Sequence, residues 1–449
     1  MNFAEQLAAF RAEFPQIEVA EVYVTDLNGI PRGKLVPIDM LEKLGEGGMR
    51  LPISTLGLDI FGADVPKNAI ALEVGDPDGI LRPLPETLAP MLWAKRPTAQ
   101  MQCMMLNETG SAVCDYDPRG VLARVVEKAT AMRLTPVMAL ELEFYLIDPE
   151  HPLPPRNPVA GGRLSRAQLY DMSVIRAFEP VLSEITEAAQ ALGAPAETAI
   201  CEFGAGQFEM NLRHVEDALE ACDHMVALKR AIRGVARAHG MDASFMPKPF
   251  GEMAGSGQHI HLSLLDETGR NIFDSGSKVP NEKVCQAVAG MLDSMADTML
   301  LYAPHHNSYR RLLPGSYAPV VAAWGIDNRG TAVRVPETSG KGARIEHRVS
   351  GSDANAYLMA AAVLAGALDG LERGLTPPEP IFGEANEEHA ELLPISWAMA
   401  EQAFYASDFV EKWLGAEFQR IYAAIKRQER STLMGRVSDV EYDAYLRTV

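Results

Sequence analysis

The sequence predicts an α+β protein with a small β-rich N-terminal domain and a larger C-terminal domain, in which helices back an antiparallel sheet. Short strands and turns dominate residues 1–115, whereas strands and long helices mix over residues 116–449. Five stretches of the larger part alternate polar and apolar residues with the period of a strand. At 449 residues the chain can bury more than one hydrophobic core.

The N-terminal part begins with a helix, in which apolar residues recur at helical spacing: Phe3, Leu7, Phe10 and Phe14. A hairpin follows, because Asn28-Gly29 is a strong turn signal between two apolar-rich runs. Asp117 and Pro118 then predict the start of a helix that reaches about Met132, with the aspartate as its N-cap.

Long helices alternate with strands over the rest of the chain. We expect them at 166–192, 215–239, 282–303, 353–373 and 396–428. Gly240 reads as the C-cap of the second of these helices, and Asp353 as the N-cap of the fourth. Residues 149–163 are rich in Pro, Gly and Arg, which is typical of a surface loop.

The composition excludes several classes of partner. The net charge of −19 argues against nucleic acid, since phosphate binding needs a basic surface. The longest apolar run is too short to span a membrane, and the N-terminus lacks the pattern of a signal peptide. Five cysteines form no CxxC pair and fit reduced thiols, so we expect a cytoplasmic protein.

The polar faces of the predicted strands carry an unusual set of side chains. The five strands lie in ALELEFYLI (139–147), GQFEMNLR (206–213), GQHIHLSL (257–264), AVRVP (332–336) and ARIEHRV (343–349). An ordinary half-exposed sheet shows Thr, Lys, Ser and Gln outward, whereas these faces show acids, imidazoles and guanidiniums. Such a surface is typical of a cleft that binds metal ions and an anionic substrate.

Six of these residues are candidate metal ligands: Glu141, Glu143, Glu202, Glu209, His259 and Glu346. Carboxylates suit Mg²⁺ or Mn²⁺, and one imidazole is compatible with both, so the set suffices for two or three ions. An isolated Glu-x-Glu pair could also be a solvated strand face. His261 could contact a nucleotide, or it could only support a neighbouring ligand.

Candidate anion-binding residues come from five arginines close together in sequence: Arg311, Arg329, Arg334, Arg344 and Arg348. Arginine binds carboxylates and phosphates through two parallel hydrogen bonds. Gly255-Ser256-Gly257 is either a simple turn or a place where the backbone approaches a ligand closely. Acids with metals, together with arginines, point to phosphoryl transfer from a nucleoside triphosphate, although the chain has neither a P-loop nor the motifs of a protein kinase.

Six motifs, in the same order, resemble the glutamine synthetase family. They are ELEFYL, CEFGAGQFE, KPFGEMAGSGQHIHLSL, NSYRRLLPGSYAPV, NRGTAVRVP and ARIEHRVSGSDANAYL. The resemblance implies a β-grasp domain over 1–115 and a glutamine-synthetase catalytic domain over 116–449. It also implies an ATP-dependent ligase that activates the γ-carboxylate of glutamate as an acyl phosphate, which an amine then attacks.

The resemblance also implies roles for single residues. One metal, near the substrate, would be held by Glu143, Glu202 and Glu209, and another, at the ATP phosphates, by Glu141, His259 and Glu346. Glutamate would contact Arg311, Arg348 and Gly255, and the nucleotide and its phosphates would contact His261, Ser263, Arg329, Arg334, Lys341 and Arg344. The residues taken as catalytic are Arg311, Arg329 and Glu209.

The chain departs from the family pattern at the amine site. Tyr317 stands where ammonia-using members carry an acid in the flap, and the stretch 50–55 lacks a second acid of those members. Because ammonium needs a negative cage to bind and lose a proton, we expect an organic amine, either a polyamine or an alkylamine. The motifs resemble the γ-glutamylpolyamine (γ-glutamylputrescine) synthetase branch.

Several alternatives stay open at the sequence level. The chain could be a glutamine synthetase that uses ammonia, or a silent structural or regulatory member of the family. Tyr317 could stack on an alkyl chain or only pack under the flap. The distal amine of a polyamine could meet Asp59, Asp64 or Glu73, although these could equally be surface acids. The resemblance further implies homo-oligomeric rings, and we expect a dodecamer.

Overall fold

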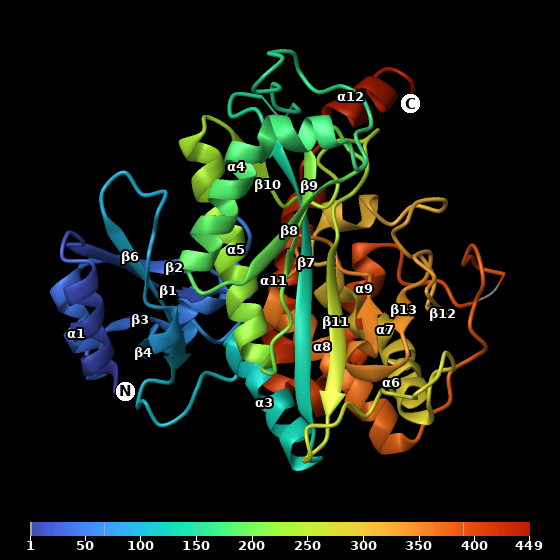
Figure 1. The fold of residues 1–449 in the computed structure, drawn as a ribbon, viewed down its shortest axis with the longest axis horizontal. Helices are drawn as coiled ribbons and strands as arrows, with labels where there is room; N and C mark the ends of the chain where they lie inside the picture. The colour runs from blue at the N-terminus through green and yellow to red at the C-terminus, as the bar shows by residue number, and fades with distance from the viewer. Residues whose placement is uncertain (1, 67, 152, 389) are drawn as a thin grey trace.

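The protein has the α+β architecture that the sequence predicts, with two separate sheets (Figure 1). The computed structural model describes residues 2–66, 68–151, 153–388 and 390–449. The N-terminal sheet lies on one side of the molecule, and the larger sheet runs through its middle between groups of helices (Figure 1).

The N-terminal sheet has the order β2-β1-β6-β4-β3, with β5 paired to β6. Its strands are β1 (Val19–Thr25), β2 (Pro31–Pro37), β3 (Arg50–Pro52), β4 (Asp78–Pro83), β5 (Ala89–Pro90) and β6 (Thr98–Leu106). The β1–β2 hairpin turns at Asn28-Gly29 as predicted, and Gly29 has a φ of +76° that favours glycine. The parallel β1–β6 pair is compatible with a β-grasp domain, although that identity and the boundary after residue 115 stay predictions.

The larger sheet has the order β12-β13-β14-β11-β7-β9-β8, with β10 paired to β7. Its strands are β7 (Thr135–Ile147), β8 (Ala196–Cys201), β9 (Gln207–Leu212), β10 (Asp242–Ser244), β11 (Gln258–Leu265), β12 (Trp324–Ile326), β13 (Val333–Glu337) and β14 (Arg344–His347). All pairs except β12–β13 are antiparallel, as expected. The predicted apolar faces are buried: Leu140, Leu142 and Phe144 on β7 are fully enclosed.

Twelve α-helices are assigned within the described residues. They are α1 (Phe3–Glu13), α2 (Leu41–Gly45), α3 (Pro118–Ala131), α4 (Met172–Ala191), α5 (Ala218–Ala238), α6 (Glu282–Asp293), α7 (Met295–Tyr302), α8 (Ala356–Arg373), α9 (Trp397–Ala406), α10 (Asp408–Leu414), α11 (Ala416–Met434) and α12 (Asp439–Tyr445). α5 packs on β7, α4 packs on β8, and α8 lies between α3, α5 and α6.

Several predicted helix limits are wrong for local reasons. The expected helix 396–428 is three helices, because Ser407 is an extended N-cap and Gly415 has a φ of +108°. The expected helix 282–303 breaks at Ser294 into α6 and α7. Asp353 is not the N-cap of α8; Asn355 takes that place, and its side chain accepts hydrogen bonds from the amides of the first turn.

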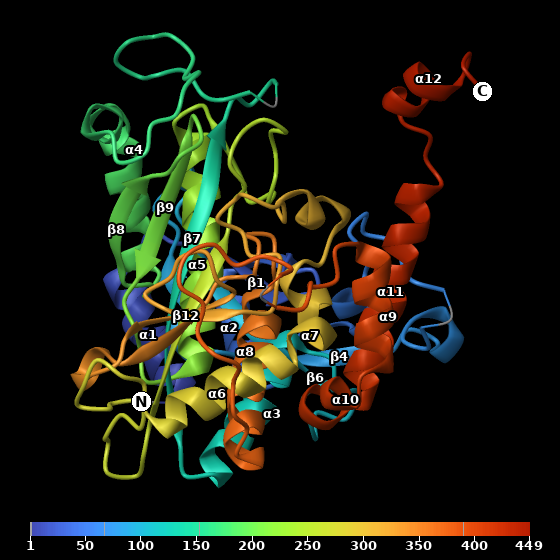
Figure 2. The same cartoon turned by 90° about the vertical axis from the view of Figure 1, so that its right-hand side faces the viewer.

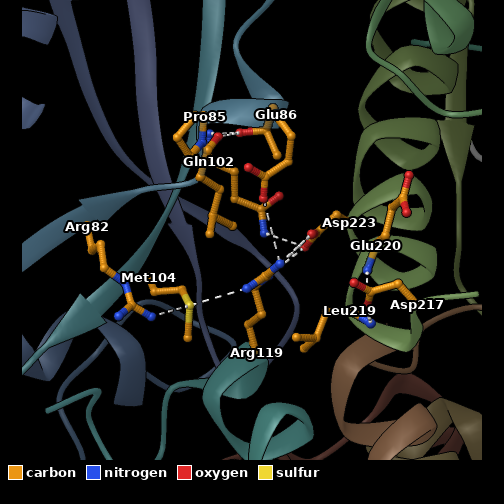
Figure 3. A network of polar contacts seen from close by, with 12 residues as sticks. Arg82, Pro85, Glu86, Gln102, Met104, Arg119, Asp217, Leu219, Glu220 and Asp223 are labelled. Atoms are coloured by element: carbon orange, nitrogen blue, oxygen red, sulfur yellow. Dashed lines mark hydrogen bonds and ion pairs between the residues drawn. The ribbon is translucent and has the colours of Figure 1, made fainter. Parts of the chain in front are cut away.

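A buried polar network joins the N-terminal sheet to the helices of the larger part (Figure 3). Arg119 at the start of α3 donates two hydrogen bonds to the carboxylate of Asp223 on α5, at 2.9 Å each. Tyr357 on α8 donates to the same carboxylate at 2.6 Å, and Gln102 on β6 donates to the Tyr357 hydroxyl. Because every charged member is paired, the network fixes the N-terminal sheet against α3, α5 and α8.

A second buried cluster joins the hairpin tip to α11. Lys426 and Glu429 are fully enclosed and lie 3.0 Å apart. Asn28 bonds to both of them, and Glu429 also accepts a hydrogen bond from the amide of Ile60 at 2.8 Å. Burial of an ion pair is costly unless its hydrogen bonds are complete, and here the hairpin and the 58–63 loop complete them.

All five cysteines are free. Among the described residues, we find no helix that combines the length and apolarity needed to cross a membrane.

Candidate active site

A first acidic cluster forms where β7, β8 and β9 meet. The register places Glu143 on β7 directly opposite Glu209 on β9. Glu202 follows the end of β8, where its amide donates to the Gln207 carbonyl at 3.0 Å. One carboxylate oxygen from each glutamate lies within 4.8 Å of the other two. The structure therefore brings together the three residues that the sequence assigned to one metal.

A second cluster lies beside the first, where β7, β11 and β14 meet. The register pairs His259 with Glu141 and His261 with Glu346. One ligand atom each of Glu141, His261 and Glu346 lies within 4.8 Å of the others. His259 Nδ1 lies 3.3 Å from Glu141 Oε2 and 3.8 Å from Glu346 Oε1. Both imidazoles thus adjoin the same carboxylates, and the predicted division between a metal-binding and a nucleotide-binding histidine stays a prediction.

The charges of the first cluster favour a cation. Burial and the neighbouring carboxylates raise the pKa of Glu209 to about 9 and that of Glu202 to about 7. Within the described residues, no lysine or arginine forms an ion pair with Glu143, Glu202 or Glu209, although the Gly257 amide donates to Glu143. Three carboxylates at this spacing, without an ion-pair partner, fit a hard divalent metal ion.

The second cluster is already partly neutralised. Burial raises the pKa of Glu346, but the charges of Arg348 and the histidines outweigh it and hold that pKa at about 2. Burial likewise opposes ionisation of Glu141, yet hydrogen bonds from His259 and His261 lower its pKa well below the ordinary value. Both carboxylates are thus ionised at neutral pH and available as ligands.

Two arginines lie buried next to the acidic clusters. Arg311 is 6% exposed and donates only to backbone carbonyls, those of Val349 at 2.8 Å and Arg348 at 3.4 Å. Burial lowers the pKa of Arg311, and the charges of Glu143 and Asp353 oppose that shift only in part. Arg348 is 7% exposed and bonds to Glu346, while its Nε has no partner in the described part of the chain. This pair can receive a carboxylate.

The 255–257 turn is a close approach and not a simple turn. A Cβ atom on Gly255 would lie 2.7 Å from Arg311 Cγ. A Cβ on Gly257 would lie 2.7 Å from Arg311 Nη2 and 2.8 Å from His259 Nε2. Both glycines are therefore needed for Arg311 and His259 to reach their places.

The predicted nucleotide-side residues lie around β14 and its loop. Arg344 Nε lies 3.3 Å from His261 Nδ1, and Ser263 Oγ donates to the Ala343 carbonyl at 2.8 Å. Lys341 is exposed in the short 3-10 helix Gly340–Gly342, and Arg329 is exposed in the turn after β12.

Arg334 is bound to carboxylates, a pairing that the sequence analysis missed. It bonds to Glu346 at 2.7 Å and to Asp327 at 2.6 Å. Asp327 lies at a φ of +49° in the loop before β13, and no motif in the sequence pairs it with Arg334.

The residues considered for the amine differ in their exposure. Tyr317 is 78% exposed in the loop that carries Gly315. Asp59 is not a surface acid, because it is 2% exposed and accepts hydrogen bonds from the amides of Phe61 and Ala63. Asp64 is exposed.

The fold and this site define a class: an enzyme whose antiparallel sheet presents carboxylates for divalent metal ions beside arginines for an anionic substrate. Residues 115–445 match the catalytic domain of glutamine synthetase. The chain belongs to the glutamine synthetase family. This family uses ATP and a divalent metal.

Two relatives act on amines according to their names. The chain is 37% identical over 450 residues to the γ-glutamylputrescine synthetase PuuA of Escherichia coli, covering 99% of this chain and 95% of that protein. It is 31% identical over 448 residues to a glutamate–isopropylamine ligase of a Pseudomonas species, with 96% and 95% coverage.

A glutamine synthetase of Pyrococcus horikoshii is similarly distant, at 31% identity over 423 residues with 92% and 89% coverage. Among solved structures, a GmaS–ADP complex has a TM-score of 0.85 and 28% identity, with 98% of this chain and 99% of that chain covered.

Proposed function

We propose that the protein is an ATP-dependent ligase that joins the γ-carboxylate of glutamate to an organic amine through a γ-glutamyl phosphate. The observation that carries the proposal is that two carboxylate clusters lie next to each other beside two buried arginines, Arg311 and Arg348. The amine specificity is supported by the 37% identity with an E. coli γ-glutamylputrescine synthetase over nearly the whole chain.

The metal ions in this proposal are Mg²⁺ or Mn²⁺, two or three per site. Glu143, Glu202 and Glu209 would hold one of them. A second would be held by Glu141, His259 and Glu346, and His261 is close enough to contribute. When bound, such ions polarise phosphoryl oxygens and neutralise their charge.

Arg311 and Arg348 hold the carboxylates of glutamate in our proposal, and Gly255 offers its backbone. Two anionic reactants must approach each other, and buried guanidiniums lower the cost of that approach. Arg311 suits this role because, among the described residues, no carboxylate forms an ion pair with it, so its charge is available to the substrate.

The phosphates and the nucleotide would be bound by Arg329, Arg334, Arg344, Lys341, His261 and Ser263. Arg329 and Lys341 are exposed, so their charges are accessible to a phosphate. Arg334 would instead exchange its exposed partner Asp327 for phosphate oxygens while keeping the buried Glu346. The proposed catalytic residues are Arg311, Arg329 and Glu209. Arg329 would act on the transferred phosphoryl group, and Glu209 would bind a metal ion.

The acceptor is the least constrained part of the site. Tyr317 replaces the acid that an ammonium ion would need, and its ring is exposed and free to cover an alkyl chain. A direct test measures phosphate release with ATP, Mg²⁺, glutamate and a panel of acceptors: putrescine, spermidine, isopropylamine, methylamine and ammonia. Turnover with an organic amine at a lower concentration than with ammonia is expected. Turnover with ammonia alone would show a glutamine synthetase instead, a reading that the archaeal relative favours.

A ring of identical subunits, with the N-terminal domain (1–115) completing a neighbour's site, is also part of the proposal. The segment after α11, residues 435–449, supports self-association. It projects from the body of the protein and contains α12 (Figure 2). Its apolar side chains are exposed, among them Val440, Tyr445 and Leu446. A surface of this kind needs a partner. A cytoplasmic location is supported by the free cysteines.

A further inference from the structure

A short 3-10 helix immediately precedes Arg311 and connects three parts of the site. It spans His306–Arg310, and Arg311 follows as its C-cap. We call residues 305–311 the anchor segment. Its three connections use different side chains of the segment, and each ends on a loop that contributes to the proposed glutamate site.

The first connection is made by the largely enclosed carboxylate of Asp353, which forms two hydrogen bonds with the anchor segment. His305 Nδ1 lies 2.8 Å from Asp353 Oδ2, and the Ser308 hydroxyl donates to the same oxygen at 2.6 Å. The side chains of Asp353 and His305 are only 11% and 18% exposed. Hydrogen bonds to an ionised acceptor are stronger than those between two neutral groups.

The second and third connections are made by Asn307 and Arg311 of the anchor segment. The side-chain oxygen of Asn307 accepts a hydrogen bond from the Lys248 amide at 2.9 Å, and its side-chain nitrogen donates one to the Lys248 carbonyl at 3.0 Å. These two bonds hold the 247–257 loop. Arg311 donates to the Val349 and Arg348 carbonyls, which hold the 348–353 loop. Asp353 ends that same loop, so the loop is tied to the anchor segment at both of its ends.

The Arg311 side chain packs tightly against the 255–257 turn. Its side chain passes so close to Gly255 and Gly257 that a Cβ on either would clash at 2.7 Å. Because Arg311 belongs to the anchor segment and packs against the 255–257 turn, a shift of that segment would move the Arg311 guanidinium relative to the turn. Arg348 would move as well, because it lies in the loop that Asp353 ends.

We infer that Asp353 is a positioning residue for glutamate: through His305 and Ser308 it sets the places of Arg311 and Arg348. This inference rests on the proposed function, and it assigns to Asp353 a role that helix capping does not explain, because Asn355 caps α8. Misplacement of a binding group by about 1 Å can cost about a hundredfold in rate.

The test compares Asp353→Ala and Ser308→Ala with the native enzyme, with phosphate release as the readout. We expect Asp353→Ala to raise the KM for glutamate by about ten- to a hundredfold, with the KM for ATP changed less than about threefold. Ser308→Ala removes one of the two hydrogen bonds and should show a smaller change in the same direction. Asp353→Asn keeps an acceptor oxygen and should recover part of the loss.

Two control variants separate positioning from general damage. Asp117→Ala removes another buried carboxylate, the N-cap of α3, and should lower the Tm without changing the KM for glutamate. Glu127→Ala changes an exposed residue of the same helix α3, outside the proposed site, and should leave both the Tm and the KM for glutamate unchanged.

An unchanged KM for glutamate in Asp353→Ala, or equal rises of the KM values for glutamate and ATP, would overturn the inference. If Asp353→Ala does not fold, Ser308→Ala carries the same test. Absence of glutamate-dependent turnover in the native enzyme would instead overturn the proposed function, so the two failures are distinct.

Discussion

Metal binding to the Glu143, Glu202 and Glu209 cluster should release protons, because a metal ion binds carboxylates only in their ionised form. In the ion-free protein, burial and mutual repulsion raise the pKa of Glu209 to about 9 and that of Glu202 to about 7. Both groups therefore carry protons at neutral pH, which they must lose when the cation enters.

The size of the effect follows from these two values. At pH 7, Glu209 carries nearly one proton and Glu202 about half, so cation binding releases about 1.5 protons. At pH 9 the release falls to about 0.5. The same linkage predicts that affinity for the cation rises roughly 15- to 20-fold between pH 7 and pH 8.

Isothermal titration of Mn²⁺ into the chelator-treated protein, repeated in buffers of different ionisation enthalpy, measures the released protons directly. Glu209→Gln removes one titrating group and should reduce the release at pH 7 by about one proton. A release at pH 7 that does not exceed the release at pH 9 would refute the reasoning. So would an unchanged release in Glu209→Gln.

Three further predictions concern the acidic cluster, the proposed glutamate site and the buried Lys426–Glu429 pair. Glu209→Ala should abolish turnover while the circular dichroism spectrum stays native, and loss of the fold would mark this acid as structural. Arg311→Ala should raise the KM for glutamate by about ten- to a hundredfold, since it removes charge-assisted hydrogen bonds; an unchanged glutamate dependence would exclude Arg311 from the substrate site. Lys426→Met leaves Glu429 buried without its cation and should cost about 3–5 kcal/mol of unfolding free energy in urea. Arg96→Ala, which breaks an exposed pair with Glu18, should cost about 1 kcal/mol or less, and equal effects of the two changes would contradict the argument.

The polar faces of the strands could be predicted from the sequence because side chains alternate with period 2 along a strand. Glu141 and Glu143 share a face for this reason, and each lies in one of the two clusters of possible ligand atoms. The fold class followed from the order of the elements.

Register between distant strands could not be predicted, because it depends on how the whole sheet packs. It decides that Glu143 faces Glu209 and that His261 faces Glu346, and therefore which ligand atoms converge. Periodicity alone could not place Glu202, which lies beyond the end of β8.

Contacts between residues far apart in the sequence could likewise not be predicted from it. Asn28 forms hydrogen bonds with Lys426 and Glu429, which lie 398 and 401 positions further along the chain. Asp353 looked like a helix cap, because an acid before an apolar run is a cap signal, but its partners are His305 and Ser308. The break at Gly415 did have a local signal, since a glycine favours the positive φ found there.

The central claim is that ATP phosphorylates the γ-carboxylate of glutamate before the amine attacks. The most direct measurement uses glutamate labelled with ¹⁸O in its γ-carboxylate, incubated with the enzyme, ATP, Mg²⁺ and an organic amine, followed by mass spectrometry of the released phosphate. Our account predicts that one ¹⁸O atom appears in the phosphate for each γ-glutamylamide formed. Unlabelled phosphate released alongside that product would contradict it.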